Sequence, residues 1–67
     1  MKFQINDYII ITDKKLALHG SIFQIEDAFT DPFGFDNYLV TGVDNDGMDW
    51  CGVHWYASEL EPIAELY

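Results

Sequence analysis

The stretch "YLVTGVDNDGMDWCGVHW", residues 38–55, decides the fold. Two runs rich in β-branched and aromatic residues, 38–43 and 48–55, lie on either side of the dipeptide Asp46-Gly47. Asp-Gly supplies the positive-φ positions that a tight hairpin turn requires. The stretch therefore predicts a β-hairpin with strands at 38–43 and 48–55.

Two more strands are predicted before this hairpin, at 8–12 ("YIIIT") and 21–27 ("SIFQIED"). In the second strand Ile22 and Ile25 are three residues apart, so we expect a bulge or strong bend that turns both inward. The segment between these strands, which carries Leu16 and Leu18, is expected to fold over the core as a long loop.

Residues 28–37 ("AFTDPFGFDN") are predicted to be a loop, because Asp31-Pro32 and Gly34 interrupt regular structure. After the hairpin, "YASELEPI" predicts a single helical turn that ends at Pro62. The final "IAELY" predicts a short last strand. Short strands at intervals of about ten residues are typical of an all-β fold, and 67 residues are enough for one domain spanning 1–67.

The charge is strongly one-sided. Twelve Asp and Glu face three Lys and no Arg, which gives a net charge of −9, and the lysines all lie within the first 15 residues. A polyanion repels phosphate backbones, so direct nucleic-acid binding is disfavoured and a basic partner is favoured. The alternative is that the charge only keeps an aromatic-rich domain soluble.

No signal peptide or membrane segment is predicted. The apolar run near the start, residues 8–11, is too short for a signal h-region, and no stretch approaches the roughly 20 apolar residues of a membrane helix. We therefore expect a cytoplasmic protein.

The order of these segments resembles that of small SH3-like barrels, including those with the KOW-type "G-x-I-x-x-I" strand, here within "HGSIFQI" (19–25). The resemblance extends through "YLV", the Asp-Gly turn and "LEPI" to the last strand. It implies a five-stranded SH3-like barrel with one short helical turn before the last strand. KOW-type domains are often basic and bind RNA or ribosomal partners, whereas this chain is acidic, so the fold is expected to carry over and the nucleic-acid binding is not.

We expect no metal, cofactor or catalytic site. "DNDGMD" (44–49) fails the EF-hand spacing, because Gly47 stands at position 4 and Trp55 at position 12. Cys51 and His54 are too few for structural zinc, which takes four ligands. Their odd spacing also places them on opposite faces of a strand, and Cys51 is expected to be a small residue in or near the core.

The favoured hypothesis is mimicry of nucleic acid by carboxylates. Seven acidic residues fall within 26–49 with no cation among them, and two phenylalanines could add apolar contacts. The predicted partner-binding residues are Glu26, Asp27, Asp31, Phe33, Phe35, Asp36, Asp44, Asp46 and Asp49. In type this resembles acidic phage-encoded inhibitors that mimic DNA. That resemblance implies a basic nucleic-acid-binding partner (a nucleoid protein, nuclease or repair enzyme) in the host cytoplasm.

A second hypothesis is an SH3-like adaptor. Trp50, Trp55 and Tyr56 could line a groove for a basic or Pro-rich peptide. Most aromatic rings are expected in the core of so short a chain, with three or four at the surface. A further alternative is a homodimer whose interface covers an apolar patch.

Overall fold

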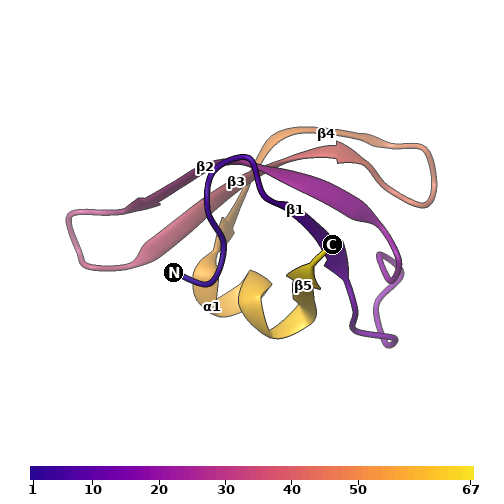
Figure 1. Ribbon diagram of the computed structural model, residues 1–67, viewed down its shortest axis with the longest axis horizontal. Coiled ribbons are helices and arrows are strands. Elements are labelled where there is room, and N and C mark those ends of the chain that lie inside the picture. The colour runs from indigo at the N-terminus through magenta and orange to yellow at the C-terminus, as the bar shows by residue number, and fades with distance from the viewer.

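The computed structural model describes residues 1–67 and contains one antiparallel sheet with a short helical segment (Figure 1). The sheet order is β4-β3-β2-β1-β5. The elements are β1 (Tyr8–Ile11), β2 (Ile22–Thr30), β3 (Asp36–Val43), β4 (Asp49–Tyr56), α1 (Ala57–Leu60), the 3₁₀ turn η1 (Glu61–Ile63) and β5 (Ala64–Leu66). None of the helices has the length and apolar character needed to cross a bilayer.

The predicted mostly-β architecture, with a helical turn before the last strand, is confirmed. The sheet is open: β4 and β5 are its two edges and do not pair with each other. The hairpin predicted at 38–55 is present, and it turns at Gly47 with φ of +80°.

The prediction of a loop over 28–37 is wrong. β2 continues to Thr30 and β3 begins at Asp36, so the connection is only Asp31–Phe35. Cross-strand pairing of Phe29 with Asn37 extends the ladder up to this turn. Favourable cross-strand pairs stabilise a sheet even where the local sequence signals a break.

The expectation that Ile22 and Ile25 both point inward is also wrong. Phe23 and Ile25 are buried, whereas Ile22 is 37% exposed, as strict alternation along a strand requires. A bulge does occur in β2, but it lies between Ile25 and Asp27. It therefore changes the direction of the residues after Ile25 instead of turning Ile22 inward.

The sheet arches over α1 and η1 (Figure 1). The core lies between them, on the inner face of the sheet. Leu18 of the β1–β2 loop packs against it, while Leu16 is exposed. The ten core residues are Phe3, Ile9, Ile11, Phe23, Ile25, Tyr38, Val40, Ala57, Leu60 and Ala64.

Because paired residues of neighbouring strands share a face, the register separates an inner from an outer face. Tyr38 pairs with Trp55 on the inner face, and the next pair, Asn37 with Tyr56, lies on the outer face. Asp27 pairs with Leu39, so its side chain is also on the outer face.

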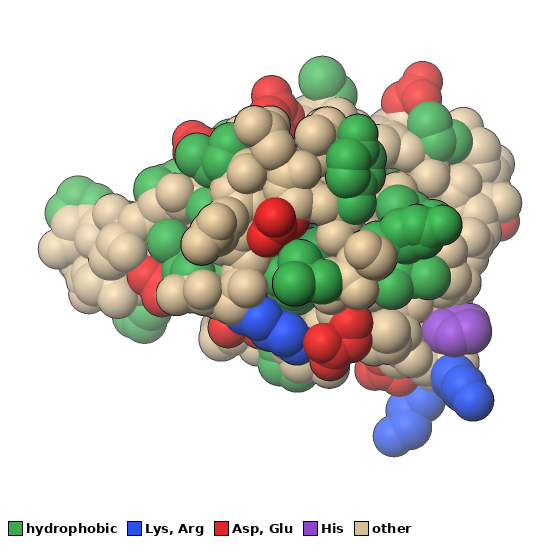
Figure 2. Space-filling model, viewed as in Figure 1, with side chains coloured by type: hydrophobic (Ala, Val, Ile, Leu, Met, Phe, Trp, Pro, Cys, Tyr) green, Lys and Arg blue, Asp and Glu red, His purple; other side chains and the backbone are tan.

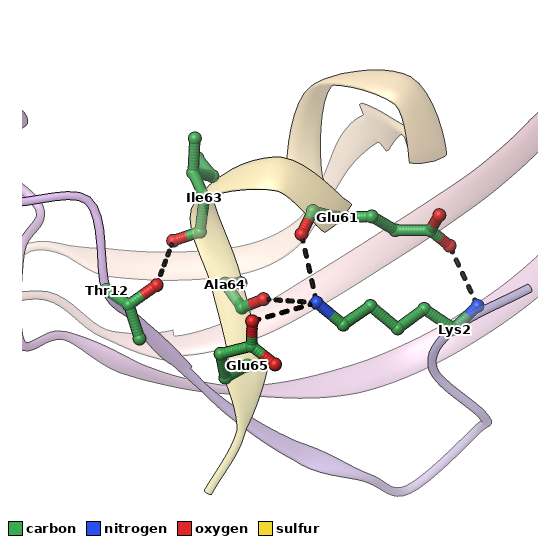
Figure 3. A network of polar contacts seen from close by, with 6 residues as sticks. All are labelled: Lys2, Thr12, Glu61, Ile63, Ala64 and Glu65. Carbon is green, nitrogen blue, oxygen red and sulfur yellow. Dashed lines mark hydrogen bonds and ion pairs between the residues drawn. The ribbon is translucent and has the colours of Figure 1, made fainter.

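Lys2 ties the N-terminal segment to the C-terminal segment (Figure 3). Its Nζ donates to the carbonyl oxygens of Glu61 (3.2 Å) and Ala64 (3.1 Å) and forms an ion pair with Glu65 (3.1 Å). Its backbone N–H donates to Glu61 Oε2 at 2.9 Å. One of the three lysines is therefore engaged within the fold.

Candidate partner-binding surface

The structure distributes the predicted acidic residues along the β2–β3 ladder instead of gathering them at one end. Asp31 and Asp36 lie at the β2–β3 turn, where Thr30 pairs with Asp36. The ladder ends seven residues later along β3, at the pair Ile22–Val43, which is about 23 Å away at about 3.3 Å per residue. The other turn, with Asp44, lies at that far end.

Asp31 holds the β2–β3 turn through its carboxylate. Oδ1 accepts the backbone N–H groups of Phe33 (2.9 Å) and Phe35 (3.0 Å), and Oδ2 accepts Asn37 Nδ2–H (3.2 Å). Burial opposes ionisation of this carboxyl. The hydrogen bonds from Phe35, Asn37 and Phe33 outweigh burial and lower the pKa of Asp31 below its ordinary value of 3.8.

Asp44 holds the β3–β4 turn in the same way. Oδ1 accepts the N–H groups of Asp46 (2.9 Å) and Met48 (3.0 Å), and Oδ2 accepts Trp50 Nε1–H (3.0 Å). The hydrogen bond from Trp50, followed by that from Met48, lowers the pKa of Asp44 below 3.8. Asp31 and Asp44 therefore both stabilise hairpin turns, and a partner cation would have to share carboxylates that already accept three hydrogen bonds each.

Four other carboxylates of the predicted set are less constrained. Glu26, Asp46 and Asp49 are exposed. Asp27 accepts only the N–H of its neighbour Ala28, at 2.9 Å.

Glu26 occupies the bulge of β2, and its side chain reaches across to β4. A Cβ placed on Gly52 would lie 3.3 Å from Glu26 Oε2. Gly52 itself lies at a second bulge, where the β3–β4 register shifts between Val40 and Gly42. The two bulges thus bring an exposed carboxylate of β2 close to β4 near the middle of the sheet.

The tip of the β2–β3 hairpin is aromatic and exposed. Phe33 is 85% exposed and Phe35 is 61% exposed. The Phe35 ring contacts the Tyr56 ring edge to face, with centroids 6.2 Å apart. A cleft of about 300 Å³ lies beside this pair and is lined by Phe35, Tyr56 and Ser58.

The three rings of the predicted peptide groove do not share one face. Trp50 and Trp55 stack on each other with centroids 6.1 Å apart and pack against the core on the inner face. Tyr56 lies on the outer face, where its ring meets that of His54 at 4.7 Å.

More rings are exposed than the expected three or four, because the outer face of the sheet and the hairpin tip are uncovered. The exposed aromatic residues are Tyr8, Phe29, Phe33, Phe35, Tyr56 and Tyr67.

Cys51 is exposed, contrary to the expectation that it packs in or near the core. The bulge in β4 beside it shifts the register, and the inner positions go to Trp50 and Trp55 instead. No group of three or more His, Cys, Asp or Glu side chains is arranged to hold a metal ion.

Sequence reasoning missed Asn37, and it considered His54 only as a metal ligand or as a catalytic partner of Cys51. Asn37 is 3% exposed and donates Nδ2–H to Asp31 and to the carbonyl oxygen of Phe35 (2.8 Å). Its Oδ1 lies 2.6 Å from His54 Nε2, so that nitrogen must carry the proton. An Asn six residues after a turn Asp is the signal that could have found this link.

No protein-family model, curated protein or solved structure matches this chain. Its surface combines free carboxylates along the sheet with an exposed aromatic hairpin tip.

Proposed function

We propose that the protein is a non-enzymatic acidic binding protein that mimics nucleic acid and blocks the basic DNA- or RNA-binding face of a target protein. The observation that carries this proposal is the density of negative charge. The net charge is −9 and the longest extent of the molecule is 34 Å. Dividing 34 Å by nine charges gives one negative charge per about 3.8 Å. One strand of B-DNA carries one phosphate per about 3.4 Å.

The cations do not interrupt this charge where the predicted binding residues lie. Lys2 is engaged by Glu61, Ala64 and Glu65. Lys14 and Lys15 lie in the loop between β1 and β2. Figure 2 shows the lysines along the lower part of the view, with carboxylates both beside them and scattered over the upper part. A basic partner would thus meet mainly carboxylates along β2, β3 and β4.

The aromatic tip supports a specific contact in addition to charge. The two turns have the same hydrogen bonds, but Phe33 stands where the other turn has Asp46. An 85% exposed ring is therefore not required to build this turn. Exposed rings beside charged groups are typical anchors of protein interfaces, and we assign this role to Phe33 and Phe35.

The fold and the cellular setting are parts of the same proposal. Five antiparallel strands with a helical turn before the last one support an SH3-like class, in which the arched sheet would correspond to an opened barrel. The proposed partner is a nucleoid protein, nuclease or repair enzyme, and the proposed setting is the cytoplasm of a host cell attacked by phage.

A second candidate is an adaptor for a basic or Pro-rich peptide. The cleft beside Phe35 and Tyr56 favours it. Trp50 and Trp55 face away from Tyr56, so such a peptide would use Phe35 with Tyr56 instead of the two tryptophans.

Affinity capture from a bacterial lysate tests the first proposal. The expected bound fraction is enriched in nucleic-acid-binding proteins and is released by high salt and by added DNA, because counterion release drives binding to polyanions. The variant E26Q/D46N/D49N should capture less, and the control K14Q/K15Q, which removes two cations and so makes the net charge more negative, should capture at least as much as the wild type. A bound fraction without nucleic-acid-binding proteins would contradict the proposal.

A further inference from the structure

The cleft lined by Phe35, Tyr56 and Ser58 lies where the start of β3 meets the end of β4 and the beginning of α1. Its volume of about 300 Å³ is at the lower end of the range for ligand pockets, and so suits a single side chain better than a large cofactor. Two of the three lining residues are aromatic, and their rings meet at an interplanar angle of 67°. Two rings set at such an angle can form two walls around one group.

The ring of Tyr56 contacts two other rings, those of Phe35 and His54. The edge contact with His54 has an interplanar angle of 83°. The His54 ring is in turn fixed by the 2.6 Å hydrogen bond between Nε2 and Asn37 Oδ1. The backbone N–H of Tyr56 donates to Glu59 Oε1 at 3.1 Å. A wall that is already ordered loses little conformational entropy when a ligand arrives.

Two carboxylates accept hydrogen bonds from the backbone of the lining residues: Glu59 from the N–H of Tyr56, and Asp31 from the N–H of Phe35. The lysines are elsewhere: Lys2 contacts the C-terminal segment, and Lys14 and Lys15 lie in the β1–β2 loop, which joins β2 at the end opposite the Asp31 turn. The cleft is thus electrostatically suited to a cation.

We propose that this cleft seats the side-chain cation of an Arg or Lys from a basic partner protein. The faces of Phe35 and Tyr56 attract the cation through their ring quadrupoles, and the nearby carboxylates add long-range attraction. A guanidinium would stack on a ring and retain its hydrogen bonds to water or to the Ser58 hydroxyl. The inference rests on the proposed function only in taking the partner to be basic.

NMR titration with two small probes tests the inference without any partner protein. The first probe is Nα-acetyl-arginine amide and the second is Nα-acetyl-citrulline amide, a neutral side chain of nearly the same shape. The arginine probe is expected to shift the signals of Phe35, Tyr56 and Ser58, with weak affinity in the millimolar range. The citrulline probe should shift them much less, because it carries no charge for the rings to attract.

Variants separate the rings from general ionic attraction. Tyr56→Leu and Phe35→Leu should each weaken binding of the arginine probe about two- to fivefold, which is the usual strength of an exposed cation–π contact. Tyr56→Phe keeps the ring and should bind as the wild type does, as should Tyr67→Leu, which changes an exposed ring outside the cleft.

Three outcomes would overturn the inference: equal shifts with citrulline, shifts that follow Asp46 and Asp49 instead of the cleft, or unchanged binding in both leucine variants. None of these outcomes bears on capture of a nucleic-acid-binding protein. The experiments can therefore contradict cation binding in the cleft without contradicting nucleic-acid mimicry, and the reverse.

Discussion

Asp31 and Asp44 hold the two hairpin turns with the same hydrogen bonds. Each Oδ1 accepts the N–H groups two and four residues later, and each Oδ2 accepts a side-chain donor six residues later, Asn37 or Trp50. Gly34 and Gly47 complete the turns with φ of +86° and +80°. The sequence thus uses one turn, D-x-x-G-x, twice, with an aromatic tip in one copy and a polar tip in the other.

The first prediction concerns acid stability. Because the pKa values of Asp31 and Asp44 are lowered in the folded state, ionisation stabilises the fold above the ordinary pKa of 3.8. This stability is lost as the pH falls below about 4 and through the folded-state pKa. Asp31→Asn and Asp44→Asn should therefore be less stable than the wild type at pH 7, and the difference should shrink at pH 3.

Urea unfolding at several pH values measures this effect. Asp46→Asn is the matched control, because its carboxylate is exposed at a turn tip and makes no hydrogen bond there. A difference between Asp44→Asn and the wild type that stays constant down to pH 2 would contradict the role of the ionised carboxylate.

The second prediction concerns the aromatic tip. Phe33→Asp copies the residue that the other turn carries at the same position, Asp46. Stability should change by less than about 0.5 kcal/mol, because an 85% exposed ring makes few contacts in the fold. Binding to a captured partner should nevertheless fall at least about tenfold, as expected for loss of an anchor. Surface plasmon resonance measures this affinity. Tighter binding by Phe33→Asp would show that charge alone determines the affinity for the partner.

The third prediction concerns a buried phenol. The Tyr38 hydroxyl donates to Glu61 Oε2 (2.5 Å) and accepts the N–H of Phe3 (3.1 Å). Burial, followed by the hydrogen bond with Glu61, raises the pKa of Tyr38 from 10.0 to about 12. The neutral phenol therefore stabilises the fold below pH 10, and this stability is lost as the pH rises from about 10 towards 12.

Tyr38→Phe should lower the free energy of unfolding by about 1–3 kcal/mol at pH 7, since it leaves the N–H of Phe3 and the carboxylate of Glu61 without this partner. Denaturant unfolding measures the change, with Tyr67→Phe at an exposed position as the control. Equal stability of Tyr38→Phe and wild type would contradict the assigned role.

The fourth prediction concerns the close approach of two strands. Gly42 has φ of +150°, and a Cβ there would lie 3.0 Å from the carbonyl oxygen of Ile22 and 3.1 Å from Phe23 Cδ1. Gly42→Ala should therefore destabilise the fold by about 1–3 kcal/mol. Thermal unfolding measures the loss, and an Ala variant as stable as the wild type would show that β2 and β3 are farther apart there.

The sequence predicted one hairpin and missed the other for a physical reason. Asp46-Gly47 follows a clear strand pattern, whereas Asp31-Pro32 and Gly34 interrupt regular structure locally and predict a loop. The longer β2–β3 ladder depends on pairs such as Ala28 with Tyr38, which are ten residues apart in the chain. The repeated D-x-x-G-x pattern was nevertheless present and would have identified this turn too.

The candidate site was only partly predictable. Composition indicated the surplus of carboxylates, and the 28–37 segment suggested Phe33 and Phe35 as partner contacts, which are both exposed. It did not indicate that Asp31 and Asp44 are held within turns, because their third donors depend on side-chain orientation. Nor did it indicate the cleft, which forms only when β3 and β4 bring Phe35 beside Tyr56.

The most direct test of the central claim is competition for a captured partner. Fluorescence anisotropy of labelled DNA bound to that partner is followed as the acidic protein is added, at several salt concentrations. Mimicry predicts that the protein displaces the DNA completely and that its affinity falls steeply as salt rises, less steeply for E26Q/D46N/D49N. A stable complex in which the partner holds both DNA and the acidic protein would contradict it.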